Sequence, residues 1–200
     1  MAYISSSVSK LGKYVKSIGL LPEETCRPDA PCVKGCYGRK GRFNTTAVHN
    51  HLVDNTREWF EHPILFKRSV IEACMLTKYF RWFYTGDIVD RKFLSMMFSV
   101  ANKVTDTKFL VFTKKYELVN EYLNKHKRPA NLCIVLSAWG DDFIPDNPHN
   151  LPMAFIRLPG KQCTIPAYAK ECSGGCENCI LSDGGCWDLQ EGEAVVFNFH

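Results

Sequence analysis

The sequence predicts an α/β fold with parallel strands, because strand-like and helical segments alternate at a regular interval. Apolar, β-prone segments begin near residues 81, 108 and 132, and one segment with helical spacing of its apolar residues lies between each pair. A connection that contains a helix joins neighbouring parallel strands. A complete eight-unit barrel usually needs roughly 250 residues, and this chain has 200. We therefore expect a small or partial (β/α) TIM-like barrel that forms a single domain over residues 1–200.

The N-terminal third is expected to hold one strand, a loop and two helices. Residues 14–21 read as the first strand, and the segment after it is rich in Pro and Gly, which favours a loop. Asn44 or Thr45 is suited to cap a helix whose apolar positions run from Val48 to Phe60. Pro63 suits the first turn of a second helix, which extends to about residue 78.

Strands and helices continue to alternate up to about residue 137, and the pattern then becomes irregular. Strands are expected at residues 81–85, 108–113 and 132–137, separated by helices at residues 90–104 and 116–126. Two further strands are expected at residues 153–158 and 194–200. Residues 140–152 read as a long polar loop, and residues 160–193 show little periodicity.

Composition and charge exclude several classes of protein. Hydrophobic residues make up 46% of the chain, which is too many for a disordered or fibrous protein. No apolar run reaches the length of a signal peptide or a membrane span. The pI near 8.5 is below the value of about 9 that indicates a nucleic-acid-binding domain. Residues 1–43 carry eight Lys and Arg against three acids, whereas residues 161–200 carry two against six. We expect a cytoplasmic protein that does not bind membranes.

Ten cysteines in 200 residues are more than ordinary usage. In a reducing cytosol, clustered cysteines more often bind metal or perform redox chemistry than form disulfides. Cys74 occupies an apolar helix position and Cys133 lies in a buried strand pattern, so both are expected to be small core residues. The eight candidate metal ligands fall near the two ends of the chain: Cys26, Cys32, Cys36, Cys163, Cys172, Cys176, Cys179 and Cys186.

Eight thiols suit either two [4Fe–4S] clusters or two structural zinc sites. The short spacings of Cys172, Cys176 and Cys179, the glycines beside them and the absence of His among the cysteines favour iron–sulfur over zinc, with disulfides as a third alternative. Three cysteines in the first group would leave one iron of a cubane open to a ligand. If Cys163 or a cysteine of the second group closes that position, the cluster becomes structural or electron-carrying. One or two clusters are therefore expected.

Polar residues that follow the predicted strands complete the candidate site. In parallel α/β folds the loops after the carboxyl ends of the strands build the site. Asp87 and Lys114 follow the second and third of these strands and are the candidate catalytic residues, for proton transfer and for holding a phosphate or carboxylate. Asp87, Ser137 and Trp139 are the candidate cofactor-binding residues, with Trp139 suited to stack on a base or cover a cluster.

The order of these motifs resembles that of a known family. Thr25-Cys26, Cys36-Tyr37, Gly86-Asp87, Ser137-Ala138-Trp139 and Cys186-Trp187 resemble, in this order, the bacteriophage gene product 88 family. The resemblance implies a phage-encoded protein in the cytosol of a bacterial host, with iron–sulfur binding on a small barrel similar to radical S-adenosylmethionine enzymes. Those enzymes carry C-x3-C-x2-C after the first strand. Here that spacing occurs instead at Cys172, Cys176 and Cys179, and S-adenosylmethionine is a candidate ligand alongside the clusters.

Two functions of different classes remain open. The first is a redox or radical-type enzyme with an open cluster bounded by Cys26, Cys32, Cys36 and Asp87, acting on a small molecule at the barrel face. The second is a non-enzymatic module in which iron–sulfur clusters or zinc hold the chain ends together, while the basic N-terminal loop contacts a host protein or nucleic acid. The sequence contains no P-loop and no G-x-G-x-x-G motif.

Overall fold

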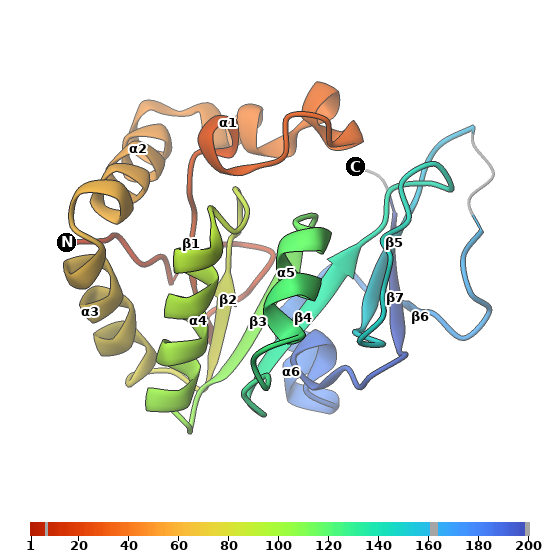
Figure 1. The fold of residues 1–200 in the computed structure, drawn as a ribbon. Helices are drawn as coiled ribbons and strands as arrows, with labels where there is room; N and C mark the ends of the chain where they lie inside the picture. The colour runs from red at the N-terminus through yellow and green to blue at the C-terminus, as the bar shows by residue number, and fades with distance from the viewer. Residues whose placement is uncertain (7, 161–163, 199–200) are drawn as a thin grey trace.

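The computed structural model describes residues 1–6, 8–160 and 164–198, and its centre is a sheet of seven strands (Figure 1). The strand order is β1-β2-β3-β4-β5-β7-β6, and every neighbouring pair runs parallel. The predicted parallel α/β fold is therefore confirmed. The strands are β1 (Val15–Ile18), β2 (Tyr79–Trp82), β3 (Lys108–Thr113), β4 (Leu132–Ser137), β5 (Met153–Arg157), β6 (Lys170–Glu171) and β7 (Ala194–Asn198).

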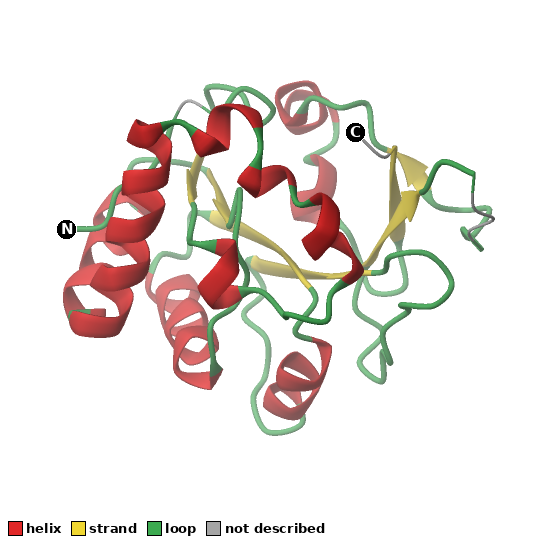
Figure 2. Ribbon diagram, turned by 90° about the horizontal axis from the view of Figure 1, so that it is seen from above, coloured by secondary structure: helices red, strands yellow, loops and turns green. Residues whose placement is uncertain are grey.

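The sheet is curved but does not close. Figure 2 shows the strands along an arc, and β1 and β6 each have one strand neighbour in the described part of the chain. The arrangement is a partial barrel with a convex face and a concave face. An isolated antiparallel bridge between Ser5 and Ser17 covers the β1 edge, with both N–H to O distances at 2.8 Å. Such a bridge hides edge groups that would otherwise be available to another chain.

Helices fill the connections between strands. The α-helices are α1 (Pro22–Thr25), α2 (Thr46–Glu61), α3 (Pro63–Cys74), α4 (Arg91–Lys103), α5 (Tyr116–Leu123) and α6 (Cys176–Ser182). Short 3-10 helices follow α1 and α6: η1 (Pro31–Gly35), η2 (Tyr37–Arg39), η3 (Gly41–Asn44) and η4 (Gly185–Asp188). The Asp90 side chain accepts the Phe93 N–H at 2.8 Å and so caps α4. Thr45 is the N-cap residue of α2, but its hydroxyl donates to Arg42 O at 2.9 Å instead of capping.

Several boundaries differ from the prediction. β2 runs two residues earlier at its start and ends at Trp82, because Phe83 adopts a positive φ of 61° that a strand does not allow. α3 ends at Cys74 and α5 at Leu123, both earlier than expected. β6, α6 and η4 lie in the segment where no regular structure was predicted. They are too short for a period to be read from the sequence.

The two faces of the sheet carry separate apolar cores. On the convex face, Phe80, Trp82, Phe109 and Val111 pack with residues of α2 to α5, and each of the four is fully buried. On the concave face, strand residues such as Leu110 and Val135 pack with the C-terminal segment that contains α6 and η4. Burial of this apolar area on both faces is the main stabilising contribution.

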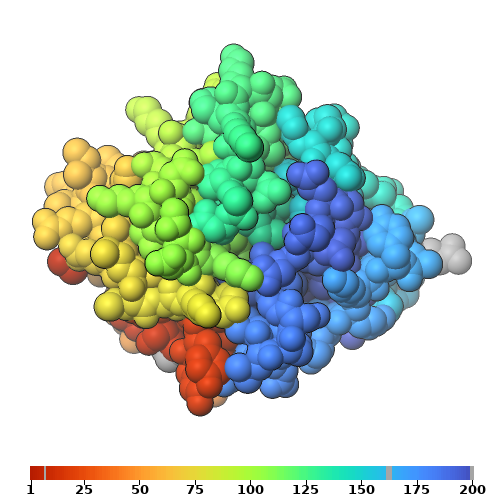
Figure 3. Space-filling model, turned by 90° about the horizontal axis from the view of Figure 1, so that it is seen from below, coloured from red at the N-terminus to blue at the C-terminus, as the bar shows by residue number. Residues whose placement is uncertain are grey.

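The C-terminal segment closes the concave face near the amino ends of the strands. Trp187 donates from Nε1 to Phe80 O at 3.1 Å, and Lys108 at the start of β3 pairs with Asp188 at 2.6 Å. The N–H of Cys176 donates to Lys10 O at 3.0 Å. Figure 3, seen from below, shows the blue C-terminal residues against the red N-terminal ones. No helix in the described residues is long and apolar enough to cross a membrane.

Candidate functional site

The first cysteine group lies over the carboxyl ends of β1 and β2. The loop after α1 returns to the end of β2, where the Tyr37 hydroxyl donates to Tyr84 O at 2.8 Å. Gly38 permits this close approach, because a Cβ there would lie 2.1 Å from Thr85 Oγ1. The loop carries the N-terminal group, which we define as Cys26, Cys32 and Cys36; all three are half-buried.

The thiols of the N-terminal group lie close enough to influence one another. The pKa of Cys26 is raised to about 12, first by burial and then by the negative charges of Asp87, Cys36 and Cys32. Burial also raises the pKa of Cys32, and the positive charge of Lys114 opposes that rise. These two thiols are therefore protonated at neutral pH when no cation is bound, and a cation that binds them must displace the protons.

Asp87 is buried at the carboxyl end of β2 and holds neighbouring elements together. Its Oδ1 accepts the Thr113 hydroxyl at 2.6 Å and the Ile88 N–H at 2.7 Å, and its Oδ2 accepts the Lys114 N–H at 2.9 Å. The Asp87 N–H donates to Thr25 Oγ1 at 3.2 Å. Burial raises the pKa of the Asp87 carboxyl, and the hydrogen bonds that it accepts offset part of that rise. Asp87 therefore links β2, β3 and the end of α1, directly before Cys26.

Lys114, Trp139 and Ser137 lie at the same edge of the sheet. The Lys114 Nζ lies 5.4 Å from the centroid of the Trp139 ring, within cation–π range. The Ser137 carbonyl accepts a hydrogen bond from the Tyr116 hydroxyl. Burial raises the pKa of Tyr116, and the charges of Asp87 and Cys32 also act on it. The structure thus brings the N-terminal group, both predicted catalytic residues and both remaining cofactor-binding candidates to one edge.

The second cysteine group lies on the concave face. We define the C-terminal group as Cys172, Cys176, Cys179 and Cys186. Cys172 follows β6 and donates its N–H to Val196 O at 2.9 Å, and Cys176 begins α6. Gly185, at φ 57°, lets the backbone directly before Cys186 lie close to Cys179, because a Cβ at Gly185 would lie 2.7 Å from Cys179 Cβ.

The thiols of the C-terminal group also influence one another's pKa values. The pKa of Cys186 is raised to about 12 by burial, then by Cys176, while Arg81 lowers it. Burial raises the pKa of Cys176, and Arg81 again opposes that rise most strongly. Cys172, Cys176 and Cys186 pack against the same apolar core.

The remaining three cysteines have different positions. Cys74 is fully buried in the convex core, as predicted. Cys133 is 5% exposed, as predicted, but it belongs to the concave core, where it lies near the C-terminal group and raises the pKa of Cys186. Cys163 lies outside the described residues.

The donor set suits a thiophilic metal centre. The nine described cysteines are all free of disulfides. Within residues 1–6, 8–160 and 164–198, no three His, Cys, Asp or Glu side chains are arranged to hold a single metal ion. Within the described residues, the half-buried cysteines form two sets of neighbouring soft donors.

Arg81, which lies between the N-terminal and C-terminal cysteine groups, was not predicted as a site residue. Arg81 lies on the concave face of β2, and its charge acts on Cys176, Cys186 and the Tyr37 hydroxyl. The signal was present in the sequence as a charged residue inside the apolar run Tyr79-Phe80-Arg81-Trp82. Only the strand register shows that Arg81 lies on the concave face, on the same side of the sheet as the C-terminal group.

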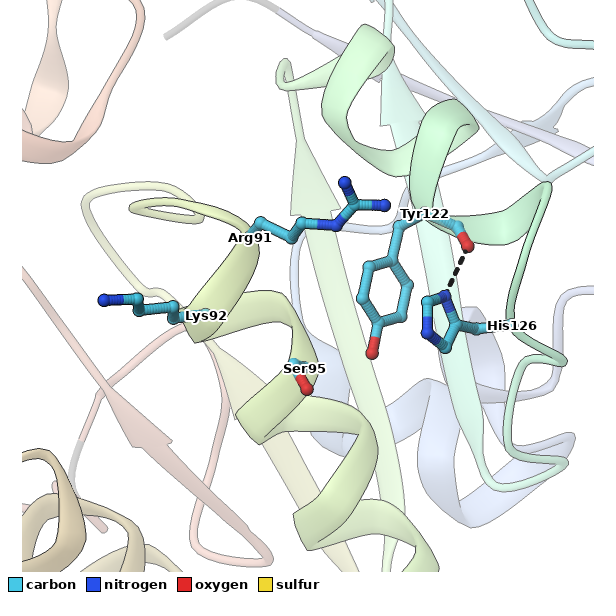
Figure 4. A pocket seen from close by; sticks show the side chains of 5 residues that line it. All are labelled: Arg91, Lys92, Ser95, Tyr122 and His126. Atoms are coloured by element: carbon cyan, nitrogen blue, oxygen red, sulfur yellow. Dashed lines mark hydrogen bonds between the residues drawn. The ribbon is translucent and has the colours of Figure 1, made fainter.

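A groove on the convex side also escaped prediction. It lies between α4 and α5 and is lined by Arg91, Lys92, Ser95, Tyr122 and His126 (Figure 4). The His126 ring stacks on Tyr122 with a centroid distance of 4.0 Å, and its Nδ1 lies 2.9 Å from Tyr122 O. None of the nine described cysteines lines this groove, so it is separate from the N-terminal and C-terminal groups.

Comparison with known families agrees with the order of motifs. The sequence model described as gene product 88 matches residues 4–176. The chain belongs to the gene product 88 family. The matched range contains the N-terminal group, Asp87, Lys114 and Trp139, and it ends at Cys176, before Cys179 and Cys186. No curated protein and no solved structure matches this member of the gene product 88 family.

Proposed function

We propose that this gene product 88 family protein binds iron–sulfur clusters at its two cysteine groups. The observation that carries the proposal is the separation of seven half-buried, disulfide-free cysteines into two sets of neighbours, one at the carboxyl edge of the sheet and one on its concave face. A cluster bound by thiolates carries electrons one at a time and, where one iron has no protein ligand, can bind a small molecule.

The C-terminal group supplies four thiolates, which is a full ligand set for a [4Fe–4S] cluster. Gly184 and Gly185 precede Cys186, and Gly174 and Gly175 precede Cys176, so the backbone can approach a bulky inorganic core. The apolar residues of the concave core exclude water from one side of the site. This cluster would therefore be structural or electron-carrying.

The N-terminal group supplies three described thiolates, and Cys163 is a candidate for the fourth. With three ligands, one iron would face Lys114 and Trp139 at the carboxyl edge. There Lys114 would attract an anionic group and Trp139 would offer a stacking surface. Asp87 already accepts three hydrogen bonds, so its main role is structural: it holds the carboxyl ends of β2 and β3 in place. S-adenosylmethionine carries a carboxylate and an adenine, so it is the ligand with which radical-type chemistry at this site can be tested.

The raised thiol pKa values give the proposal a pH dependence. Cys26 and Cys186 both have a pKa of about 12 when no metal is present, so each releases a proton on binding. Affinity for the cluster therefore rises with pH. We expect reconstitution of the metal-free protein with iron and sulfide to be more complete at pH 8.5 than at pH 6.5.

Anaerobic purification followed by a visible spectrum and counts of iron, sulfide and zinc tests the proposal. Two clusters correspond to about eight irons per chain. Cys186→Ala and Cys32→Ala should each remove about half of the iron. Cys74→Ala is the matched control, since that thiol is buried on the opposite face and its loss should leave the iron count unchanged. A colourless protein with stoichiometric zinc would contradict iron–sulfur binding.

The open iron is tested separately. If iron is present, addition of S-adenosylmethionine should alter the paramagnetic signal of the reduced N-terminal cluster, and Lys114→Ala should weaken that response. An unchanged signal at saturating S-adenosylmethionine indicates a closed cluster and an electron-carrying role.

A second candidate is a metal-held binding module, favoured by the exposed basic residues beside the N-terminal group. Lys34, Lys40 and Arg42 are all exposed on that loop. Metal at the two groups would then tether the chain ends, and the basic loop would contact an acidic host protein or nucleic acid. Chelation of the metal should lower both the unfolding temperature and salt-sensitive binding to such a partner, without any redox activity in the loaded protein.

A further inference from the structure

The interior of the partial barrel contains a charged residue whose role the proposed function leaves open. In β2 the side chains alternate between faces: Phe80 and Trp82 are buried in the convex core, and Tyr79 packs against the concave core. Arg81 therefore points to the concave side. Its neighbours in register are Ser17 on β1 and Leu110 on β3.

The guanidinium of Arg81 packs against an aromatic ring, but one of its hydrogen-bond donors has no partner and its charge has no ion pair among the described residues. Its Cζ lies 4.9 Å from the centroid of the Phe112 ring, and Phe112 packs edge-on against Phe197. Its Nε is buried and has no hydrogen-bond partner in the described residues. Within the same part of the chain, no carboxylate forms an ion pair with Arg81. Arg81 as a whole is half-buried, but a buried Nε donor without a partner costs free energy unless an acceptor or anion pairs with it.

The anion that fits is the C-terminal group when its cysteines are thiolates. Cys172, Cys176 and Cys186 pack on the same concave core as Phe112, the ring that holds the guanidinium. Lys10 is a second cation beside this core, since its backbone O accepts the Cys176 N–H at 3.0 Å. Lys10 is exposed, and its Nζ lies over Phe197 at 5.3 Å, so solvent screens its charge.

We propose that Arg81 is the internal counter-charge of the C-terminal cluster, with its Nε directed to the thiolate sulfurs. This inference rests on the proposed function. A fixed positive charge beside a cluster favours the reduced form, which carries one more negative charge, and so raises the reduction potential. Arg81 is a positioning and tuning residue, because it acts on the cluster without ligating iron.

The test compares cluster potentials in the full-length protein by redox titration followed by electron paramagnetic resonance. At the midpoint potential of the wild type, Arg81→Gln should lower the ratio of reduced to oxidised C-terminal cluster about tenfold, equal to 59 mV for one electron. Arg81→Lys should restore most of that ratio. Lys10→Gln removes the same charge from the exposed neighbour and should change the ratio less than threefold.

Two further variants show which cluster and which charge a change in reduction potential belongs to. A Cys32→Ala protein lacks the N-terminal cluster, so the remaining signal belongs to the C-terminal one. Arg68→Gln removes an exposed charge on α3 that pairs with Glu72, and it should leave the potential unchanged.

The outcomes separate the inference from the proposed function. Iron-loaded protein with equal potentials in wild type, Arg81→Gln and Arg81→Lys overturns the role of Arg81 and leaves cluster binding intact. Wild-type protein that binds no iron after anaerobic reconstitution overturns both. If Arg81→Gln fails to fold, Arg81→Met takes its place, because it keeps an apolar stem against Phe112 while removing the charge, and a potential equal to that of the wild type overturns the inference.

Discussion

Replacement of Asp87 separates its role in holding the site from any role in chemistry. The buried carboxylate accepts hydrogen bonds from one hydroxyl and two backbone N–H groups, at 2.6, 2.7 and 2.9 Å. In Asp87→Asn, the amide oxygen can keep the two donors at the Oδ1 position. The amide NH₂ then faces the Lys114 N–H, which leaves two donor groups without an acceptor, the Lys114 N–H and the new NH₂.

The magnitudes follow from the count of unpaired donors. One unsatisfied buried donor costs about 1–3 kcal/mol, so the two donor groups left without an acceptor in Asp87→Asn should lower the free energy of unfolding by about 3 kcal/mol. Asp87→Ala unpairs three donors and should lower it by about 4 kcal/mol, less than three times the single cost because the chain can relax. Removal of the buried charge offsets part of the loss in both variants.

Urea unfolding of the metal-free protein at pH 7 measures these differences, and Thr113→Val supplies a matched variant. The Thr113 hydroxyl donates to Asp87 and accepts the Lys115 N–H at 3.0 Å, so its loss should cost about 1–2 kcal/mol. In the double variant Asp87→Ala/Thr113→Val, the loss of stability should be smaller than the sum of the two single losses, because both single variants break the Thr113–Asp87 hydrogen bond. Asp87→Asn with wild-type stability would refute the reasoning and return Asp87 to a purely chemical role.

Two further predictions concern the concave core. Cys133 has a pKa of about 12 against 9.0 for a free thiol, so its stabilising contribution is present below pH 9 and is lost as pH rises towards 12. The free energy of unfolding of metal-free Cys133→Ala should therefore fall less steeply between pH 9 and 10.5, by about 1 kcal/mol per pH unit, and an identical slope in urea titrations would contradict this. Trp187→Phe removes the hydrogen bond from the indole Nε1 to Phe80 O and should lower the free energy of unfolding by about 1 kcal/mol. The same variant should speed proteolytic cleavage near α6, and unchanged cleavage would show that the indole does not anchor the segment.

The central strands could be predicted because their signals are local. Residues 108–113 and 132–137 are apolar, β-prone runs between helical segments, and both strands have the predicted limits. β2 was misplaced because its end depends on the positive φ of Phe83, which no residue preference at Phe predicts. α6 has seven residues, fewer than two turns, so its period could not be distinguished from a loop.

The carboxyl edge of the site followed from a topological rule. Once the strands are parallel, the loops after them meet at one edge, and the structure places Cys26, Asp87, Lys114 and Trp139 there. The binding and catalytic roles of these residues remain predictions that the proposed experiments address. Tyr116 and Thr25 were not predicted, because their contacts with Ser137 and Asp87 cross between elements far apart in the sequence.

The residue pattern alone determines that this chain alternates helices with parallel strands and gathers its cysteines near both ends, since both properties are local or counted along the chain. Three-dimensional packing determines where the second cysteine group goes. In residues 1–6, 8–160 and 164–198 the sheet has seven strands and stays open, so its concave face needs an apolar cover, and the C-terminal segment with Trp187 supplies it. That packing places Cys176 and Cys186 near Arg81, because side-chain direction in a strand depends on register and not on composition.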